Sequence, residues 1–215
     1  MTATPGEFGA PGALTPSCVA ERILAAASDL CTLVGVKRTT ITDIARYADL
    51  DDTLIRSQWE TVTDIVGAVV IRDFHAGIDH TESRIRSHEQ LRDVIAEAFA
   101  AAYWFLDSHP IVGGVVRSDA DTLLPTATVS ITAVVTAVTR WLVDVVTTAA
   151  RQRAGLIVDA ERLEEVTTRL IQSMLLAPNV SAPTDTFGAV IGYAGLRYVP
   201  LVYAMCLPGA DEAPC

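Results

Sequence analysis

Residues 15–59 place the strongest constraint on the fold, because apolar side chains recur there at helical spacing in three short blocks separated by turn residues. Thr15 followed by Pro16 is a favoured helix start, and Gly35 indicates where that first helix ends. Within the block, residues at three- and four-residue intervals form one apolar stripe: Val19, Ile23, Leu24, Ala27, Leu30 and Cys31.

Two further helices follow within 25 residues. The spacing predicts a helix over 41–48, which Thr39 or Thr40 can cap, and a third over about 51–59. Asp49 and Leu50 form the turn between them. The residues predicted to face inward are Ile41, Ile44, Ala45, Ala48, Leu50, Leu54 or Ile55, and Trp59. Three helices in under fifty residues, the last two joined by a tight turn, indicate a helix-turn-helix.

The remainder of the chain is also predicted to be helical, since strand-like alternation bounded by hairpin turns is absent. Pro110, Gly155 and the segment 177–183 interrupt the helical pattern. The predicted helices cover residues 61–80, 86–107, 110–118, 122–153, 159–176 and 184–206. The sequence therefore predicts an all-α fold with a flexible arm (1–14), a three-helix helix-turn-helix domain (15–66) and a six-helix domain (67–215).

Half of the 215 residues are hydrophobic and the mean hydropathy is +0.35, so a membrane span has to be considered. The best candidate, 122–139, contains Pro125 and several threonines and is followed at once by Arg140. A buried or dimer-forming helix explains this run better. The first residues lack the basic and apolar regions of a signal peptide. We therefore expect a cytoplasmic protein without a membrane partner.

The sequence offers no signature of catalysis or metal binding. Its cysteines are far apart and without C-x-x-C pairing, and its histidines are scattered: Cys18, Cys31, Cys206 and Cys215; His75, His80, His88 and His109. No zinc-protease, nucleophile-elbow or glycine-rich phosphate motif is found. We expect no metal, no cofactor and no enzymatic activity.

The segment ERILAAASDLCTLVGVKRTTITDIARYADL, residues 21–50, closely resembles the N-terminal segment of tetracycline-repressor (TetR) family transcription regulators. In that family an R-I-L-x-A-A helix precedes a glycine, a Thr-Thr pair and an x-D-I-A helix. The residues that fit are Arg22, Ile23, Leu24, Ala26, Ala27, Gly35, Thr39, Thr40, Asp43, Ile44 and Ala45. The resemblance covers about fifty residues; the later helices add only a suitable number and length.

The resemblance implies a homodimer that binds a palindromic double-stranded DNA operator, with the third helix of each subunit in the major groove. It also implies that the C-terminal domain binds a small effector and mediates dimerisation. A ligand-responsive regulator, and a repressor in particular, is the leading hypothesis. The alternative is a TetR-like module that binds small molecules or proteins and whose DNA-reading head, the helix-turn-helix domain (15–66), is degenerate.

The third helix departs from the family pattern and is acidic. Where the family has a Ser-Lys-like start, a tyrosine, a terminal aromatic and a following lysine, this chain has Asp51, Asp52, Arg56, Trp59 and Val62. Between residues 18 and 66 acidic side chains outnumber basic ones by eight to five, which predicts weak phosphate binding. Asp51 is interpreted as a helix cap, and Asp52 as either a dipole partner or an acceptor for a cytosine amino group.

Three sets of site residues follow. The DNA-contacting candidates, of which Arg56 is the foremost, are Lys37, Arg38, Thr39, Thr40, Arg46, Tyr47, Thr53, Arg56, Ser57 and Gln58. A pocket for a mostly apolar effector is assigned to Phe99, Tyr103, Trp104, Arg140, Trp141 and Asp144, for which plain core packing is the alternative. A small-residue dimer interface is assigned to Ser173, Ala177, Gly188, Gly192 and Gly195, for which packing within one subunit is the alternative.

Overall fold

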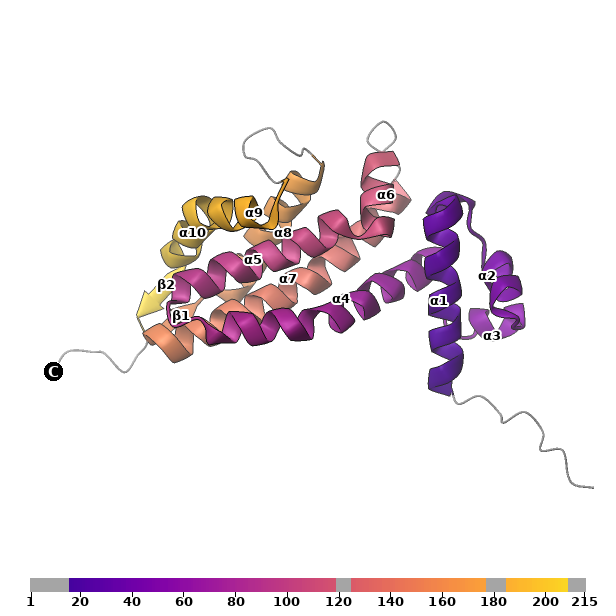
Figure 1. Cartoon of the computed structure of the whole chain (residues 1–215), viewed down its shortest axis with the longest axis horizontal. Helices are drawn as coiled ribbons and strands as arrows, with labels where there is room; N and C mark the ends of the chain where they lie inside the picture. The colour runs from indigo at the N-terminus through magenta and orange to yellow at the C-terminus, as the bar shows by residue number, and fades with distance from the viewer. Residues whose placement is uncertain (1–15, 119–124, 177–184, 209–215) are drawn as a thin grey trace, which may run out of the picture.

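A computed structural model describes residues 16–118, 125–176 and 185–208 of the chain; the predicted arm (1–14) lies outside this part. The molecule is elongated, with α1, α2 and α3 at one end and the other helices bundled beside α4 (Figure 1). The helices are α1 (Pro16–Val34), α2 (Ile41–Ala48), α3 (Asp52–Arg56), α4 (Val62–Ser87), α5 (Leu91–Ser108), α6 (Pro110–Ser118), α7 (Pro125–Ala154), α8 (Ala160–Leu176), α9 (Phe187–Tyr193) and α10 (Val199–Ala204). The described part is thus almost wholly helical, as predicted.

The first three helices pack together at one end of a hydrophobic core that continues into the larger domain. The predicted stripe of α1 faces inward, and Ile23, Ile44 and Ile55 are fully buried where α1, α2 and α3 meet. Of the two alternatives in the third helix, Ile55 is the buried residue, whereas Leu54 is 38% exposed. The third helix is shorter than predicted and ends at Arg56, after which turn-type hydrogen bonds carry the chain to Trp59.

Helix α4 connects the two ends of the molecule without a break. The predicted domain boundary between residues 66 and 67 lies inside it, and it continues to Ser87 rather than ending near residue 80. Ile85 is buried and Arg86 pairs with Glu82 one turn earlier, so the last turns are held by both packing and charge. The next helix consequently begins at Leu91, five residues later than predicted.

Helix α5 forms the centre of the larger domain and is buried on nearly all sides. Helices α4, α6, α7, α8 and α9 contact it. The predicted final helix is a continuous path in which a π-helical turn, Ala194–Tyr198, joins α9 to α10. Pro200 follows that turn and has no amide hydrogen to donate, which favours a local change in the hydrogen-bond pattern.

A short β-ladder was not predicted. Strands β1 (Leu156–Val158) and β2 (Cys206–Pro208) pair antiparallel, with Ile157 opposite Leu207. Gly155, at a φ of 61°, ends α7 in the left-handed conformation and turns the chain into β1. Strands of three residues are too short to show a periodic pattern in sequence.

The helical path 187–204 is the described segment that is long and apolar enough to cross a membrane by length and composition, and 28% of it is buried. The run 122–139, considered above on sequence grounds, instead contributes to α7, where Val134, Val135, Val138 and Thr139 are buried; residues 122–124 lie outside the described part.

Candidate functional site

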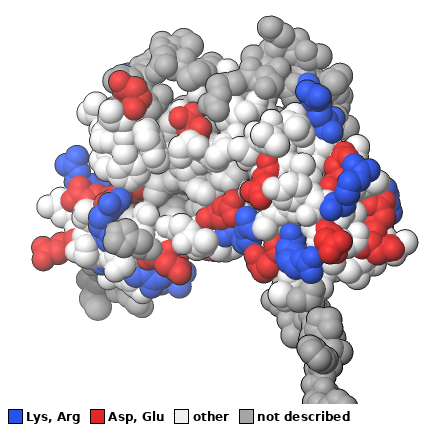
Figure 2. Space-filling view, turned by 45° about the vertical axis from the view of Figure 1, so that its right-hand side comes forward, with Lys and Arg blue, Asp and Glu red and all other residues white. Residues whose placement is uncertain are grey.

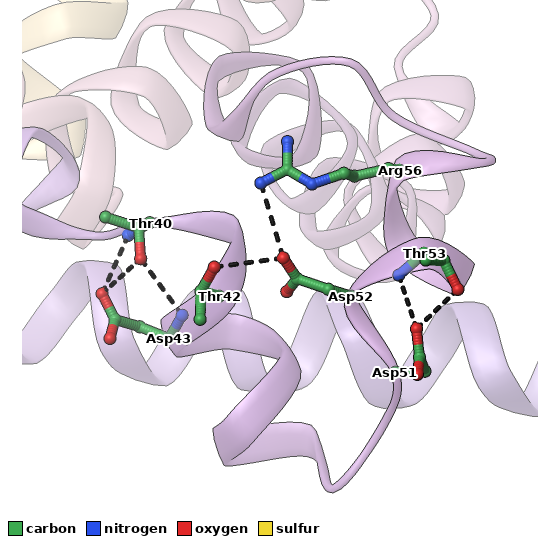
Figure 3. Close-up of polar contacts among 7 residues, drawn as sticks. All are labelled: Thr40, Thr42, Asp43, Asp51, Asp52, Thr53 and Arg56. Carbon is green, nitrogen blue, oxygen red and sulfur yellow. Dashed lines mark hydrogen bonds and ion pairs between the residues drawn. The ribbon is translucent and has the colours of Figure 1, made fainter.

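The N-terminus of α2 is closed by a reciprocal capping box (Figure 3). The Thr40 hydroxyl accepts a hydrogen bond from the Asp43 amide (3.1 Å), and the Asp43 carboxylate accepts one from the Thr40 amide (3.2 Å). Hydrogen bonding to Thr40 lowers the pKa of Asp43. Of the two threonines predicted as caps, Thr40 is therefore the cap. Thr39 is buried, and its hydroxyl donates to the carbonyl oxygen of Gly35 (3.0 Å).

The N-terminus of α3 is capped by Asp51, which confirms the interpretation of this residue as a cap. Its carboxylate accepts hydrogen bonds from the amide (2.8 Å) and the hydroxyl of Thr53 (Figure 3). These bonds lower the pKa of Asp51. Thr53, a candidate for contacting DNA, thus already uses its hydroxyl within the helix.

Asp52 connects α2 and α3 through one carboxylate oxygen. Its Oδ2 accepts a hydrogen bond from the Thr42 hydroxyl on α2 (3.1 Å) and lies 3.5 Å from a terminal guanidinium nitrogen of Arg56 (Figure 3). The Arg56 side chain remains 55% exposed. The acidic start of α3 is therefore engaged within the protein: Asp51 with the backbone, and Asp52 with Thr42 and Arg56.

The other candidate side chains surround these two caps. Arg46 pairs with Asp43 (3.4 Å) but is largely exposed, and Tyr47 is 57% exposed. Lys37 and Arg38 belong to a 3-10 turn, Val36–Arg38, immediately before α2. Ser57 and Gln58 are exposed just after α3. A groove of about 470 Å³ lies among these residues, and its lining is Leu30, Val34, Arg38, Thr39, Asp43, Arg46 and Tyr47.

Sequence reasoning missed the part that α1 plays in this groove. Leu30 was predicted as a core residue and Val34 was not singled out, yet both form a wall of the groove. Helical periodicity identifies the side of α1 that faces inward. It does not show which part of that side α2 leaves uncovered. The packing of α1 against α2 in the structure shows that Leu30 and Val34 line the groove.

The N-terminal helices carry no continuous basic stripe on the face drawn in Figure 2, where red and blue side chains are interspersed. Arg22 donates to the carbonyl oxygens of Ala48 and Asp49 and thereby ties α1 to the end of α2. Arg46 and Arg56 each pair with an aspartate. Positive charge in this region is therefore partly used for internal contacts.

Two cavities among the described residues of the larger domain include predicted pocket residues. The first, of about 510 Å³, lies between α4, α5 and α7 and includes Trp141 and Asp144. The indole N–H of Trp141 donates to Glu82 (2.8 Å), and this bond is the main cause of a lowered pKa of Glu82. The full lining is Glu82, Ile85, Arg86, Val94, Trp141, Asp144, Val145, Thr148, Ala149, Gln152 and Arg153.

The second cavity, of about 200 Å³, is more aromatic and includes Trp104. The Arg84 guanidinium lies 5.5 Å from the ring centroid of Phe187 at one wall and also pairs with the buried Glu97. Its lining is Phe74, Gly77, Ile78, Thr81, Arg84, Ala101, Trp104, Phe105, Ser108 and Phe187. Arg84 and Phe187 were not predicted, because they lie far from Trp104 in sequence.

The other predicted pocket residues are placed elsewhere. Phe99 and Tyr103 are fully buried, and Phe99 stacks against Tyr198 at a centroid distance of 4.4 Å. Both residues belong to the core and line neither cavity. Arg140 is exposed and pairs with Glu164 on α8 (3.1 Å) rather than with Asp144. The pattern of six residues therefore divides among two cavities, the core and the surface.

The predicted dimer residues lie on an open surface. Ser173, Gly188 and Gly192 are exposed and Gly195 is half-buried, whereas Ala177 lies outside the described residues. A Cβ atom added at any of the three glycines meets nothing within 4 Å. Close packing within the subunit therefore does not account for these glycines. Large apolar side chains are exposed nearby, namely Leu196 (78%), Leu201 (38%) and Tyr203 (43%).

Comparison with solved structures shows the fold. The chain is similar to the TetR-family repressor AlkX from Dietzia sp. (TM-score 0.53, 16% identity, 89% of this chain and 99% of that one). It is also similar to a TetR transcriptional regulator from Rhodococcus sp. (0.52, 17%, 86% and 95%) and to the regulator FadR from Bacillus subtilis in complex with stearoyl-CoA (0.53, 14%, 85% and 96%). No protein-family profile and no curated protein sequence matches the chain.

These likenesses extend over both ends of the molecule, so the predicted architecture is confirmed: a helix-turn-helix followed by a larger helical domain, in the fold of TetR-type regulators. The sequence resemblance stops near residue 50, whereas the structural likeness continues through the larger domain. At identities of 14 to 17% the likeness concerns the fold.

Proposed function

We propose that the protein is a ligand-responsive transcriptional regulator of the TetR type that represses by binding an operator. This proposal is carried by the two capped helices α2 and α3, which lie at one end of a TetR-type fold (Figure 1). The exposed residues Arg38, Arg46, Tyr47 and Arg56 lie on or next to these helices. The exposed cations Arg38 and Arg46 beside α2 suit phosphate oxygens, and the exposed Arg56 suits a base edge.

The operator form that we propose is a palindrome bound by a homodimer. The glycine-containing face of α9 and the π turn supports this form, because it is open in the monomer and is accompanied by exposed apolar side chains. Two copies of this face, with Ser173 on α8, bring four helices together. The same interface explains the exposed apolar helix 187–204 without a membrane, and we place the protein in the cytoplasm.

The effector that we propose is a small, mostly apolar molecule held in the larger domain. The aromatic cavity at Trp104, with Arg84 at its wall, offers apolar area and one cation, and the cavity at Trp141 offers a more polar alternative. FadR from Bacillus subtilis was solved with stearoyl-CoA, which supports a ligand of apolar character. Intrinsic fluorescence of Trp104 and Trp141 provides the screen: fatty acids and acyl-CoA esters should change it, and Trp104→Phe should abolish the change if the aromatic cavity is the site.

The decisive test of DNA binding is selection from randomised duplexes by the full-length protein at low salt, followed by footprinting. We expect a protected palindrome, and Arg56→Ala should weaken a salt-sensitive complex by roughly 5- to 150-fold, the discrimination of one bidentate arginine contact. The exposed Arg169 on α8, far from the head in the sequence and paired with Glu165, serves as the matched control. Enrichment of no sequence would contradict the proposal.

A second candidate function is a TetR-like binding module without operator recognition. The excess of acidic over basic residues in the head and the internal pairing of Arg46 and Arg56 favour it. The two candidates differ in DNA binding: Arg56→Ala should weaken a salt-sensitive DNA complex of the regulator. A module that has lost operator binding should select no sequence, and Arg56→Ala should change nothing. Neither candidate involves catalysis or a cofactor.

A further inference from the structure

The arrangement of Thr42, Asp52 and Arg56 bears on how an acidic head could read DNA. Thr42 on α2 donates to Asp52 Oδ2 at 3.1 Å, and Arg56, one turn further along α3, approaches the same oxygen at 3.5 Å (Figure 3). The two helices of the helix-turn-helix are thus joined through one carboxylate. Of these three residues, Arg56 is the one that extends into solvent, with 55% of its side chain exposed.

The two carboxylate oxygens of Asp52 have different surroundings. Its Oδ1 is buried and has no hydrogen-bond partner among the described residues, and its Oδ2 receives the two donors. About a third (35%) of the Asp52 side chain is exposed, and the donors from Thr42 and Arg56 share its Oδ2. The contacts of Oδ2 with Thr42 and Arg56 give Asp52 a role besides its favourable interaction with the helix dipole.

Pairing with Asp52 changes what Arg56 can contribute to binding. The carboxylate offsets the charge of the guanidinium, which reduces its value for nonspecific phosphate attraction. The guanidinium nevertheless has five N–H donors in a fixed plane, and one nitrogen held by Asp52 leaves others for a bidentate contact. A side chain already held in one orientation also loses less conformational freedom when it binds.

We propose that Asp52 is a positioning residue that orients Arg56 toward the O6 and N7 acceptors of a guanine in the major groove. Asp52 then increases the preference for one base pair and lowers the affinity for DNA of any sequence. The acidic start of α3 would thereby contribute to sequence recognition. This inference rests on the proposed function, because it requires that the head binds DNA.

The test uses the full-length protein, the sequence that it selects from randomised duplexes, and single base-pair variants of that sequence. Arg56→Ala should reduce the preference for one G·C pair by roughly 5- to 150-fold. Asp52→Asn should lose at least several-fold of the same preference, while affinity for random DNA rises and its log-log salt dependence steepens by up to about 0.9. Asp52→Glu, which keeps a carboxylate one turn from Arg56, should restore most of the preference.

Asp51→Asn is the matched control, because it removes the same charge from the neighbouring position and asparagine still caps a helix. It should raise affinity for random DNA but leave the base preference unchanged. In the Arg56→Ala background, Asp52→Asn should no longer alter preference at that pair. Equal effects of Asp51→Asn and Asp52→Asn, or uniform weakening of all sequences by Arg56→Ala, would overturn the inference while leaving DNA binding intact. A wild-type protein that selects no sequence would overturn both proposals.

Discussion

The imidazole Nε2 of His109 lies 3.2 Å from the Asp73 carboxylate, which joins the start of α6 to the middle of α4. Asp73 also accepts two hydrogen bonds from Arg72, and another nitrogen of Arg72 is 3.7 Å from Glu21 on α1. These four side chains connect the helix-turn-helix with the junction of α5 and α6. Helix α1 also packs on α6, so the helix-turn-helix contacts the larger domain at this junction.

His109→Ala should lower the free energy of unfolding by about 1–3 kcal/mol, because it removes a buried ring and leaves Asp73 without that donor. Urea unfolding followed by circular dichroism provides the measurement. His75→Ala, at an exposed position of α4, is the control and should change stability by less than about 0.5 kcal/mol. Equal losses in the two variants would show that the contact with Asp73 contributes nothing of its own.

The hydroxyl groups of Thr167 and Tyr198 share a buried hydrogen bond of 2.7 Å that ties α8 to the π turn. Tyr198→Phe should destabilise the protein by about 1–3 kcal/mol, since the Thr167 hydroxyl then stays buried without this partner. Thr167→Val combined with Tyr198→Phe should cost less than the sum of the single changes, because neither unpaired group remains. Additive losses in a double-mutant cycle would contradict this coupling. Burial also raises the pKa of Tyr198, so its hydroxyl stays protonated and can donate or accept in this hydrogen bond.

The helices and caps of the helix-turn-helix domain were predicted well because each depends on residues close together in the sequence. The inward stripe of α1, the position of α2 and the caps at Thr40 and Asp51 all depend on residues within a few positions of one another. The contact between Thr42 and Asp52 spans a turn whose geometry depends on Asp49 at a positive φ of 51°, and so it became visible only in three dimensions.

The larger domain was harder to predict, since aromatic residues at helical spacing look alike whether they fill a core or line a cavity. Tyr103 and Trp104 are adjacent in sequence, yet the first is fully buried and the second lines the smaller cavity. What distinguishes them is Phe187, more than eighty residues away, which packs edge-on against Trp104 at 6.3 Å. Periodicity within α5 carries no information about that partner.

The caps of α2 and α3 should make the head sensitive to acid. The pKa values of Asp43 and Asp51 are lowered in the folded protein, mainly by hydrogen bonds from Thr40 and Thr53 respectively. A depressed pKa contributes stability above the unfolded-state value of 3.8, and that stability is lost as the pH falls through the folded value.

Asp51→Asn should therefore reduce the fall in melting temperature between about pH 5 and pH 3, because the amide caps without titrating. Melting curves at several pH values provide the measurement, and Asp29→Asn on the exposed side of α1 controls for the loss of one charge. If both variants keep the full acid sensitivity of the wild type, the cap of α3 is not its source.

Gly192→Leu should dissociate the proposed dimer without harming the subunit. A Cβ atom at this position meets nothing in the monomer, and leucine favours a helix over glycine by roughly 1 kcal/mol, so the isolated fold should be as stable or more so. In the dimer the same side chain lies on the face formed by Gly188, Gly192 and Gly195, where it keeps the two copies apart. Sedimentation velocity should show a shift from dimer to monomer, whereas Gly67→Leu on α4, also open around its Cβ, should not. An unchanged dimer with leucine at position 192 would move the interface to another surface.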